Sequence, residues 1–352
     1  MEGFTRLRVA SVDALTDDAV TLTFDVPPQH AEAFRFSAGQ HLTLRRVLDG
    51  DDLRRTYSVC SSAAGGPLRV AVRRLEGGAF STWATGELRA GEELEVLPPA
   101  GRFGPSVDAG RALRYGLIAA GSGITPVLSI AATVLDVEPA SEVVLLYGNR
   151  TQRDVMFLDE LADLKDRHPE RLQVVHVLSR EEQGSELLSG RLDPARLRRL
   201  FATLVPVQDV DEWYLCGPFG LVTDGRQALL DAGADPSRVH VELFHAEAPP
   251  PRARPAGPVG DAATVTVLLH GRSTTLAVER AGDSVLDAVL AVRPDAPYAC
   301  KGGVCGTCRA RLVSGDVEMD VNYALEPDEL AAGVVLTCQS HPTSDEVRLE
   351  FL

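Results

Sequence analysis

The chain has 352 residues, of which 45% are hydrophobic and 24% are charged, and it carries a formal net charge of −15. This length predicts two or three domains of ordinary globular composition, because a single core rarely grows beyond about 250 residues. The excess of acidic side chains argues against a nucleic-acid partner and an anionic membrane surface, since both are bound by clustered Lys and Arg.

The sequence lacks the pattern of an export signal or a membrane span. Residues 1–6 have neither a basic nor an apolar signal region, and the longest apolar stretch, residues 115–135, is broken by Gly121, Gly123 and Pro126. We therefore expect a cytoplasmic protein, in which thiols stay reduced. Its six cysteines then serve as metal ligands or buried thiols rather than as disulfides.

Short alternating apolar runs, separated by Gly and Pro turns, occupy the first part of the chain. Residues 19–24 and 41–44 show this alternation, and Pro27-Pro28 and Gly65-Gly66 are among the turns. Such a rhythm predicts antiparallel strands that close into a small β-barrel. We assign residues 1–107 to this domain.

Two segments of this first domain have the chemistry of a flavin site. In residues 55–58 (RTYS), Arg55 offers a bidentate grip on a pyrophosphate, Tyr57 can stack on a flat ring, and the Ser58 hydroxyl can donate to a ring nitrogen. Alone, the segment also suits a strand with a salt-bridged arginine. A glycine turn downstream, residues 77–81 (GGAFS), precedes a helix-like stretch and can offer backbone amides to a phosphate.

From about residue 112 the chain alternates buried strands with helices, which predicts a parallel α/β sheet. We assign residues 108–246 to this second domain. The expected strands are residues 113–120, 142–147, 172–178 and 212–216, and the expected helices are residues 125–135, 155–167 and 219–232.

Two strand ends in the second domain predict nucleotide contacts. Residues 121–126 (GSGITP) place a glycine turn between a strand and a helix, where a helix N-terminus can meet a phosphate. Pro126 stands where the common dinucleotide motif has its third glycine, and a packing turn is the alternative. Cys216-Gly217 ends another strand, at the edge where open α/β sheets bind ligands, although an ordinary strand exit has the same pattern.

The last part of the chain begins after a proline-rich segment. Residues 246–261 contain five prolines, and we expect residues 247–261 to be a linker and residues 262–352 a separate domain. In that domain Cys300, Cys305, Cys308 and Cys338 have the spacing of a plant-type [2Fe–2S] cluster. The glycines Gly302, Gly303 and Gly306 permit the tight backbone that points N–H groups at sulfur. Structural zinc is the alternative, although it usually takes paired cysteine knuckles.

Taken in this order, the RTYS, GGAFS, GSGITP and CGP segments resemble the ferredoxin–NADP reductase superfamily. With the added ferredoxin domain, the chain resembles the reductase components of bacterial multicomponent oxygenases, and most of all the reductase subunits of 1,2-phenylacetyl-CoA epoxidases. The residues that carry this resemblance are 300–308 (CKGGVCGTC), Met319, 322–326 (NYALE) and Cys338-Gln339.

The resemblance implies a role for each matching residue. Ser58 and Cys216 become the candidate catalytic residues, since they would flank the flavin and the nicotinamide where hydride moves. FAD would be held by Arg55, Tyr57, Ser58, Gly78, Ala79, Phe80 and Ser81, and covered by Phe244; the nicotinamide nucleotide would be held by Gly121, Gly123, Thr125, Cys216 and Gly217.

NADPH is favoured over NADH by the residues that follow two strands. Ser179 and Arg180 follow the strand at 172–178, where relatives bind the 2′-phosphate, and Arg150 follows the preceding strand. An NAD site would favour a carboxylate on the ribose hydroxyls, and Glu181 is adjacent. A solvated arginine is the alternative interpretation of Arg180.

These features predict a reductase that passes electrons from NADPH through FAD and a [2Fe–2S] cluster to an oxygenase component. A flavin is needed between the other two because a nicotinamide gives two electrons together and the cluster accepts one. The oxygenase implied by the resemblance is the phenylacetyl-CoA 1,2-epoxidase of phenylacetate degradation. Two alternatives remain at this point: a reductase for an aromatic-ring or steroid hydroxylase, and a non-catalytic iron–sulfur or zinc module.

Overall fold

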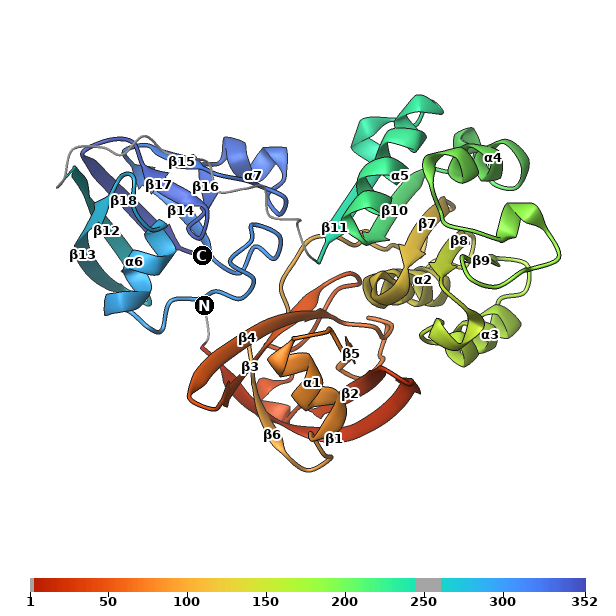
Figure 1. The fold of residues 1–352 in the computed structure, drawn as a ribbon, viewed down its shortest axis with the longest axis horizontal. Helices are drawn as coiled ribbons and strands as arrows, with labels where there is room; N and C mark the ends of the chain where they lie inside the picture. Colours follow the sequence, from red (N-terminus) through yellow and green to blue (C-terminus); the bar gives the residue numbers. More distant parts are fainter. Residues whose placement is uncertain (1–2, 245–260) are drawn as a thin grey trace. The chain divides into compact units, whose positions relative to one another are not determined.

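The computed structural model describes residues 3–244 and 261–352, so all of the predicted linker except Asp261 lies outside the described ranges. The chain divides into two compact units, of which the first is Phe4–Phe244 and the second contains the C-terminal domain (Figure 1). None of the helices in the described residues is both long and apolar enough to cross a membrane.

The first unit begins with a six-stranded antiparallel sheet that closes into a barrel. The strand order is β4-β3-β6-β1-β2-β5, and a bridge between Val59 and Val70 joins the two ends of that order. Helix α1 (Ala79–Gly86) inserts Phe80 and Trp83 into the barrel core. The strands are β1 (Thr5–Thr16), β2 (Ala19–Asp25), β3 (His41–Leu48), β4 (Asp51–Ser58), β5 (Arg69–Arg73) and β6 (Glu93–Val96).

The rest of the first unit is a five-stranded parallel sheet in the order β11-β10-β7-β8-β9. The chain builds outward from β7 in one direction and then returns to add β10 and β11 on its other side. The carboxyl ends of β7 and β10 therefore form a topological switch point, which is where open α/β sheets bind ligands. The strands are β7 (Arg114–Ala120), β8 (Glu142–Asn149), β9 (Leu172–Leu178), β10 (Glu212–Gly217) and β11 (Val239–Leu243).

Helices cover both faces of this parallel sheet (Figure 1). Helices α2 (Ile124–Val137) and α3 (Leu158–Arg167) share one core cluster with the sheet, and α4 (Pro194–Thr203) and α5 (Phe219–Asp231) share another. The helix expected over residues 155–167 begins only at Leu158, because a capped 3₁₀ turn ends at Asp154 and Phe157 has a φ of 60°. Alternate residues of each buried strand supply the two clusters, as the pleat of a strand requires.

Side-chain contacts hold the barrel against the parallel sheet within this unit. The Arg69 guanidinium donates to both carboxylate oxygens of Glu160, at 3.0 and 2.6 Å. The Ser129 hydroxyl on α2 donates to the carbonyl of Ser61 at 2.7 Å, and the backbone N–H of Ala63 donates to Thr133 at 2.9 Å. The barrel and the nucleotide sheet are thus fixed relative to each other.

The second unit is an α+β fold around its own core. Its five-stranded sheet has the order β13-β12-β18-β14-β16, in which β12 and β18 are parallel, and α6 (Val285–Val292) shares the sheet's core cluster. The predicted combination of antiparallel barrel, parallel α/β sheet and α+β ferredoxin domain is confirmed. The remaining elements are β12 (Ala262–Leu269), β13 (Arg272–Glu279), β14 (Arg309–Ser314), β15 (Val317–Met319), α7 (Pro327–Ala331), β16 (Val334–Leu336), β17 (Ser340–Pro342) and β18 (Glu346–Phe351).

Candidate functional site

Strand β4 presents the first predicted flavin residues at the edge of the barrel sheet. Arg55 and Tyr57 share one face of the strand and Ser58 lies on the other, because side chains alternate along a strand. Arg55 is exposed, and Tyr57 is half-buried with its ring centroid 5.7 Å from that of Phe80. Phe80 is only 1% exposed. Its ring therefore supports Tyr57 from within the barrel, and its backbone is the part that can reach a cofactor.

The N-terminus of α1 fits a phosphate group. Gly78 is the N-cap, no side chain caps the helix, and its first turn contains no acidic residue. The Ser81 hydroxyl accepts from the N–H of Leu75 at 3.0 Å and donates to the carbonyl of Gly78 at 3.1 Å. This hydroxyl therefore holds the turn in shape, while the N–H groups of the first turn, including that of Ala79, have no intrahelical acceptor. Together with Arg55 and Tyr57, these residues fit FAD.

The glycine turn after β7 packs directly against the end of β10. Any β-carbon at Gly123 would overlap the carbonyl oxygen of Cys216, so only glycine fits there. Thr125 is buried, and its hydroxyl donates to the carbonyl of Ser122 at 3.0 Å. Like α1, helix α2 has no side-chain cap and no acidic residue in its first turn. The turn thus offers backbone N–H groups to a phosphate, while the Thr125 hydroxyl holds the turn itself.

Arg73, on β5 of the barrel, reaches this glycine turn although no local pattern in the sequence selects it. Its Nε donates to Asp18 at 2.8 Å, and its Nη2 lies 3.6 Å from a carboxylate oxygen of Asp154. A β-carbon at Gly121 would lie 3.3 Å from Nη1 of Arg73. The barrel therefore places a fixed positive charge beside the predicted nucleotide phosphates, and the two carboxylates hold it there.

Three side chains meet where β4, β10 and β11 end, and we call Ser58, Cys216 and Glu242 the strand-end triad. Ser58 Oγ donates to Oε2 of Glu242 at 3.3 Å, and Cys216 Sγ lies 4.0 Å from the same oxygen. Cys216 and Glu242 are also direct neighbours in the parallel register of β10 and β11. The structure thus brings together both predicted catalytic residues and adds Glu242.

Burial keeps the strand-end triad uncharged near neutral pH. It raises the pKa of Glu242 to about 8, and the hydrogen bond from Ser58 opposes this shift. Burial also raises the pKa of Cys216 well above its ordinary value, and a charge on Glu242 would raise it further. At pH 7 most molecules therefore hold a proton on the Glu242 carboxyl and another on Cys216 Sγ.

The remaining predicted residues around the triad are neighbours of these strand ends. Gly217 follows Cys216 in β10, and a β-carbon there would lie 3.2 Å from the backbone nitrogen of Ala120. Phe244 follows β11 and packs, partly buried, against the core cluster that contains Cys216. Glu242 lies only two residues before Phe244. A polar residue near the end of a short strand indicates no function by itself, so no local pattern in the sequence selects Glu242.

Backbone hydrogen bonds bring the predicted 2′-phosphate residues together. The N–H of Arg180 donates to the carbonyl of Arg150 at 2.7 Å, and the N–H of Ser179 donates to Asn149 at 2.9 Å. Both arginines are exposed. Glu181, the residue that argued for NADH, accepts from the N–H of Gln152 at 2.9 Å. The carboxylate of Glu181 is thus engaged with the backbone, beside two exposed guanidinium groups.

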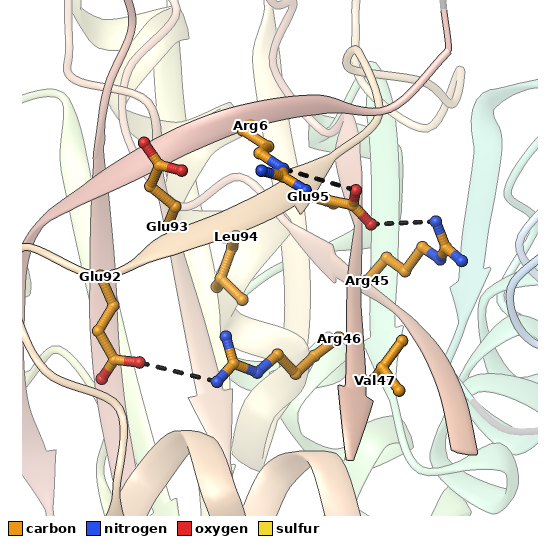
Figure 2. A pocket seen from close by; sticks show the side chains of 8 residues that line it. All are labelled: Arg6, Arg45, Arg46, Val47, Glu92, Glu93, Leu94 and Glu95. Atoms are coloured by element: carbon orange, nitrogen blue, oxygen red, sulfur yellow. Dashed lines mark hydrogen bonds and ion pairs between the residues drawn. The ribbon is translucent and has the colours of Figure 1, made fainter. Parts of the chain in front are cut away.

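A separate hollow of about 620 Å³ lies on the barrel surface where β3 and β6 diverge (Figure 2). Its charged residues neutralise one another: Glu95 pairs with Arg45 at 3.0 Å and with Arg6 at 3.9 Å, and Arg46 pairs with Glu92 at 3.9 Å. None of the predicted site residues lines it, and it offers no net charge to a phosphate. Its lining is Arg6, Arg45, Arg46, Val47, Glu92, Glu93, Leu94 and Glu95.

In the second unit the four cluster cysteines form two pairs. Cys300 lies beside Cys305, and Cys308 lies beside Cys338. Among the described residues, no group of three or more His, Cys, Asp or Glu side chains is arranged to hold one metal ion. Two thiols at each of two positions fit a two-iron cluster, in which each iron takes two thiolates, better than one tetrahedral zinc.

The loop that carries three of these cysteines turns its N–H groups toward sulfur. The N–H of Gly302 donates to Cys300 Sγ at 3.3 Å, and that of Thr307 donates to Cys305 Sγ at 3.5 Å. Hydrogen bonds from the Cys305 thiol and from backbone N–H groups lower the pKa of Cys300 to about 5, although burial opposes this. The loop therefore presents backbone donors to the sulfurs of Cys300 and Cys305.

Positive φ angles shape this loop, and one of them was not predicted. Gly303 and Gly306 have φ values of 75° and 64°, as expected of glycines in a tight loop. Lys301 has a φ of 52°, whereas Gly302 does not adopt a positive φ. The Lys301 side chain is held by Asp287, whose carboxylate lies 2.7 Å from Nζ. The strained position is thus Lys301, and Gly302 serves through its N–H.

Comparisons with known proteins cover both units. Family models match in chain order: the oxidoreductase FAD-binding domain (residues 6–104), the oxidoreductase NAD-binding domain (117–227) and the 2Fe-2S iron-sulfur cluster binding domain (267–343). The chain is 46% identical to the E component of 1,2-phenylacetyl-CoA epoxidase from Escherichia coli (strain K12), over 100% of this chain and 98% of that protein. The predicted FAD, pyridine nucleotide and [2Fe–2S] cluster are confirmed, without a distinction between NADPH and NADH.

Two further relatives extend the comparison. The chain is 37% identical to the ferredoxin reductase component of 3-ketosteroid-9-alpha-monooxygenase from Rhodococcus rhodochrous, over 98% of this chain and 96% of that protein. Among solved structures, phthalate dioxygenase reductase matches with a TM-score of 0.61 at 26% identity, and the match covers 99% of this chain and 98% of that one. That protein is described as a modular structure for electron transfer from pyridine nucleotides to [2Fe–2S].

Proposed function

Since this chain belongs to the FAD- and [2Fe–2S]-containing reductases of oxygenase systems, we propose that it passes electrons from NADPH to an epoxidase that acts on phenylacetyl-CoA. The chain is an NAD(P)H-dependent oxidoreductase. A non-catalytic module is not supported, because models of both oxidoreductase domains match the chain.

The observation that carries the redox proposal is the strand-end triad at the switch point of the parallel sheet. When bound, FAD accepts a hydride from the nicotinamide and releases the electrons one at a time. The chain would hold the flavin and the nucleotide in place. Tyr57, whose ring packs on that of Phe80, offers a flat face for stacking, and Gly123 lets the nucleotide turn pack against Cys216. The protonated Glu242 carboxyl leaves no negative charge beside the nicotinamide, and its contact with Ser58 fixes that hydroxyl.

Phosphate groups would be held at three places in the first unit. The N-terminus of α1 with Arg55 suits the flavin pyrophosphate, and the turn at Gly121 with Arg73 suits the nucleotide pyrophosphate. Arg150 and Arg180, with Ser179, form an exposed positive corner for the 2′-phosphate of NADPH. This corner is the reason to prefer NADPH to NADH.

The identity of the electron acceptor rests on similarity along the whole chain. The similarity to the epoxidase component from Escherichia coli covers all domains, and that to the 3-ketosteroid monooxygenase component is lower. We place the protein in the cytosol, where the four ligand thiols are kept reduced before the cluster is assembled. A steroid hydroxylase is the second candidate acceptor.

Reconstitution of turnover tests this proposal. The holoprotein, NADPH and a purified phenylacetyl-CoA epoxidase oxygenase are incubated with phenylacetyl-CoA, and the ring 1,2-epoxide is measured by mass spectrometry. We expect turnover that depends on this protein and is faster with NADPH than with NADH. A 3-ketosteroid hydroxylase is tested in parallel, and turnover with it alone would refute the epoxidase as the electron acceptor. A preference for NADH would refute the assignment of NADPH.

A further inference from the structure

Gln339 follows the fourth cluster cysteine and connects the two chain segments that supply the thiols. Its side chain is 8% exposed. Its Nε2 lies 3.3 Å from Sγ of Cys338, 3.0 Å from the Cys338 carbonyl and 3.0 Å from the Lys301 carbonyl. We propose that Gln339 is a positioning residue that sets the reduction potential of the cluster through a hydrogen bond to Cys338 Sγ.

The orientation of the Gln339 amide follows from its neighbours. The oxygen and nitrogen of a side-chain amide must be assigned from the hydrogen-bond network. Both carbonyls beside Nε2 are acceptors only, so the NH₂ end must face them. The same end then also faces Cys338 Sγ, and because it has two hydrogens for three acceptors, the sulfur shares one of them with a carbonyl. A reversed amide would place its oxygen against two carbonyl oxygens and a thiolate.

Backbone contacts fix the place from which this side chain starts. The N–H of Gln339 donates to the carbonyl of Leu336 at 2.9 Å, and its carbonyl accepts from the N–H of Asp320 at 2.9 Å. Cγ of Gln339 would lie 3.3 Å from any β-carbon at Gly303. The side chain is therefore packed between the turn that carries Cys338 and the loop that carries the other three cysteines. It has little room to move away from the sulfur.

A donor at this sulfur favours the reduced cluster. Reduction adds one electron to the cluster and its four thiolates, while no bond breaks and no proton moves. The added negative charge is shared by the sulfurs, and a hydrogen bond to a charged acceptor is stronger than one to a neutral acceptor. Hydrogen bonds to the sulfurs are among the factors that set the potential of such clusters. A neutral amide supplies this effect without adding a charge of its own.

Cys338 differs in this respect from two other ligands. Cys300 and Cys305 accept from the backbone N–H groups of Gly302 and Thr307, which almost any sequence would supply. The contact of Nε2 with Cys338 Sγ depends on the identity of one side chain. Position 339 is therefore a place where a substitution can change the potential while the loop keeps its backbone.

Redox titration of the holoprotein tests the proposal. The midpoint potential is measured by EPR during titration with dithionite, for the native protein, for Gln339→Leu and for Gln339→Met, which keeps an unbranched chain. We expect the one-electron equilibrium to shift about tenfold toward the oxidised cluster in both variants, which corresponds to a fall of about 59 mV. The flavin potential serves as an internal reference and should not change.

Thr337→Val is the matched control from the same turn. The Thr337 hydroxyl is buried and donates to the Cys308 carbonyl at 3.0 Å rather than to a sulfur. We expect this variant to lose stability but to keep the native cluster potential. Equal shifts of the midpoint potential in Thr337→Val and Gln339→Leu, or no shift in the Gln339 variants, would show that Gln339 only stabilises the turn.

A measurement on the native protein keeps the proposal testable if no variant assembles a cluster. With ¹⁵N in the glutamine side chains, pulsed EPR of the reduced cluster should show a hyperfine coupling to an amide nitrogen, and its absence would overturn the proposal. The inference rests on the [2Fe–2S] cluster alone. Neither measurement requires NADPH or an oxygenase, so a failure of the proposed acceptor or nucleotide would be distinguishable from a failure of this inference.

Discussion

The thiols of the cluster loop and the side chains of the strand-end triad are both largely buried, yet the protein treats their charges in opposite ways. In the cluster loop, the backbone N–H groups of Gly302 and Thr307 donate to the sulfurs of Cys300 and Cys305. Around Glu242 the one hydrogen bond from Ser58 does not offset burial, and the pKa of the carboxyl rises to about 8. One site is prepared to hold negative charge and the other to avoid it.

This difference follows from the local structure that forms each site. A loop with several positive φ angles can turn consecutive N–H groups toward one point. At the ends of β4, β10 and β11, most N–H groups are already used by the sheets, so few donors remain for a carboxylate. The same distinction suits their proposed uses, since the cluster must be bound by thiolates, whereas a neutral triad would lie beside the proposed nicotinamide site.

The largest expected effect is the loss of the cluster without the loss of flavin reduction. Cys338→Ala removes one of the two thiols at one iron position, so we expect loss of the cluster and of all electron transfer to an oxygenase. Iron and sulfide content and the visible spectrum report the cluster, and stopped-flow bleaching reports flavin reduction by NADPH, which should persist. Cys60→Ala is the control, because Cys60 is buried in the other unit. A native iron content in Cys338→Ala would contradict the ligand assignment.

The next effect tests whether the triad acts through shape or through charge. Glu242→Ala removes the partner of Ser58, and we expect flavin reduction by NADPH to slow about 100-fold, as for a small misplacement of reacting groups. Glu242→Gln keeps the shape of the neutral carboxyl and should slow it much less. Stopped-flow absorbance measures both rates.

Glu212→Ala controls for the loss of a carboxyl on the same pair of strands. Glu212 begins β10 and lies 2.8 Å from His240 of β11, at the opposite end of the sheet. This variant should reduce flavin at the native rate. Equal slowing by Glu242→Gln and Glu242→Ala would mean that a charged, not a neutral, Glu242 matters.

A smaller effect concerns the exposed arginine corner of the first unit. Arg180→Ala removes a charge-assisted hydrogen bond to the 2′-phosphate, so we expect the KM for NADPH to rise about tenfold while that for NADH stays the same. Steady-state ferricyanide reduction with each nucleotide measures this. Arg198→Ala, an exposed arginine of α4, should alter neither value. An equal rise in KM for both nucleotides would show that Arg180 does not bind the 2′-phosphate.

The smallest effect is a dependence of stability on pH. The folded pKa of Glu242, about 8, lies above the ordinary value of 4.5. Its contribution to stability is therefore complete below pH 4.5 and is lost as pH rises through 8. Glu242→Gln should gain stability relative to the native protein over this range, by on the order of 1 kcal/mol because Glu242 is half-buried and its charge is partly screened by solvent. Chemical unfolding at pH 6 and pH 9 measures the free energy of unfolding of both proteins. An equal change with pH in the native protein and in Glu242→Gln would contradict the raised pKa.

The sequence predicted all three architectures because their signals are local, and the cluster ligands that it indicates stay predictions. Three of the cysteines lie within nine residues, and alternation or helical periodicity identifies the strands and helices. The roles assigned to individual flavin and nucleotide residues, and the domain limits, stay predictions. Within the loop, Lys301 also adopts a positive φ, which no pattern in the sequence indicates.

Glu242 and Arg73 could not be selected in the same way. Each belongs to a strand whose pattern explains it without any function, and each becomes notable only through a neighbour far along the chain. Glu242 meets Ser58, 184 residues away, and Arg73 meets Gly121 across the barrel and the sheet. Such proximity depends on how the two sheets pack, and no local pattern of residues encodes it.

The close contact between Gly123 and the carbonyl of Cys216 determines which part of the nucleotide surface can be changed by protein engineering. Any side chain at position 123 would push the strand end that carries the thiol, so this part of the surface tolerates no redesign. Arg150 and Arg180 stand on exposed strand exits away from that contact. Substitutions that change the nucleotide preference can therefore be confined to the arginine corner, and they leave the geometry around Cys216 as it is.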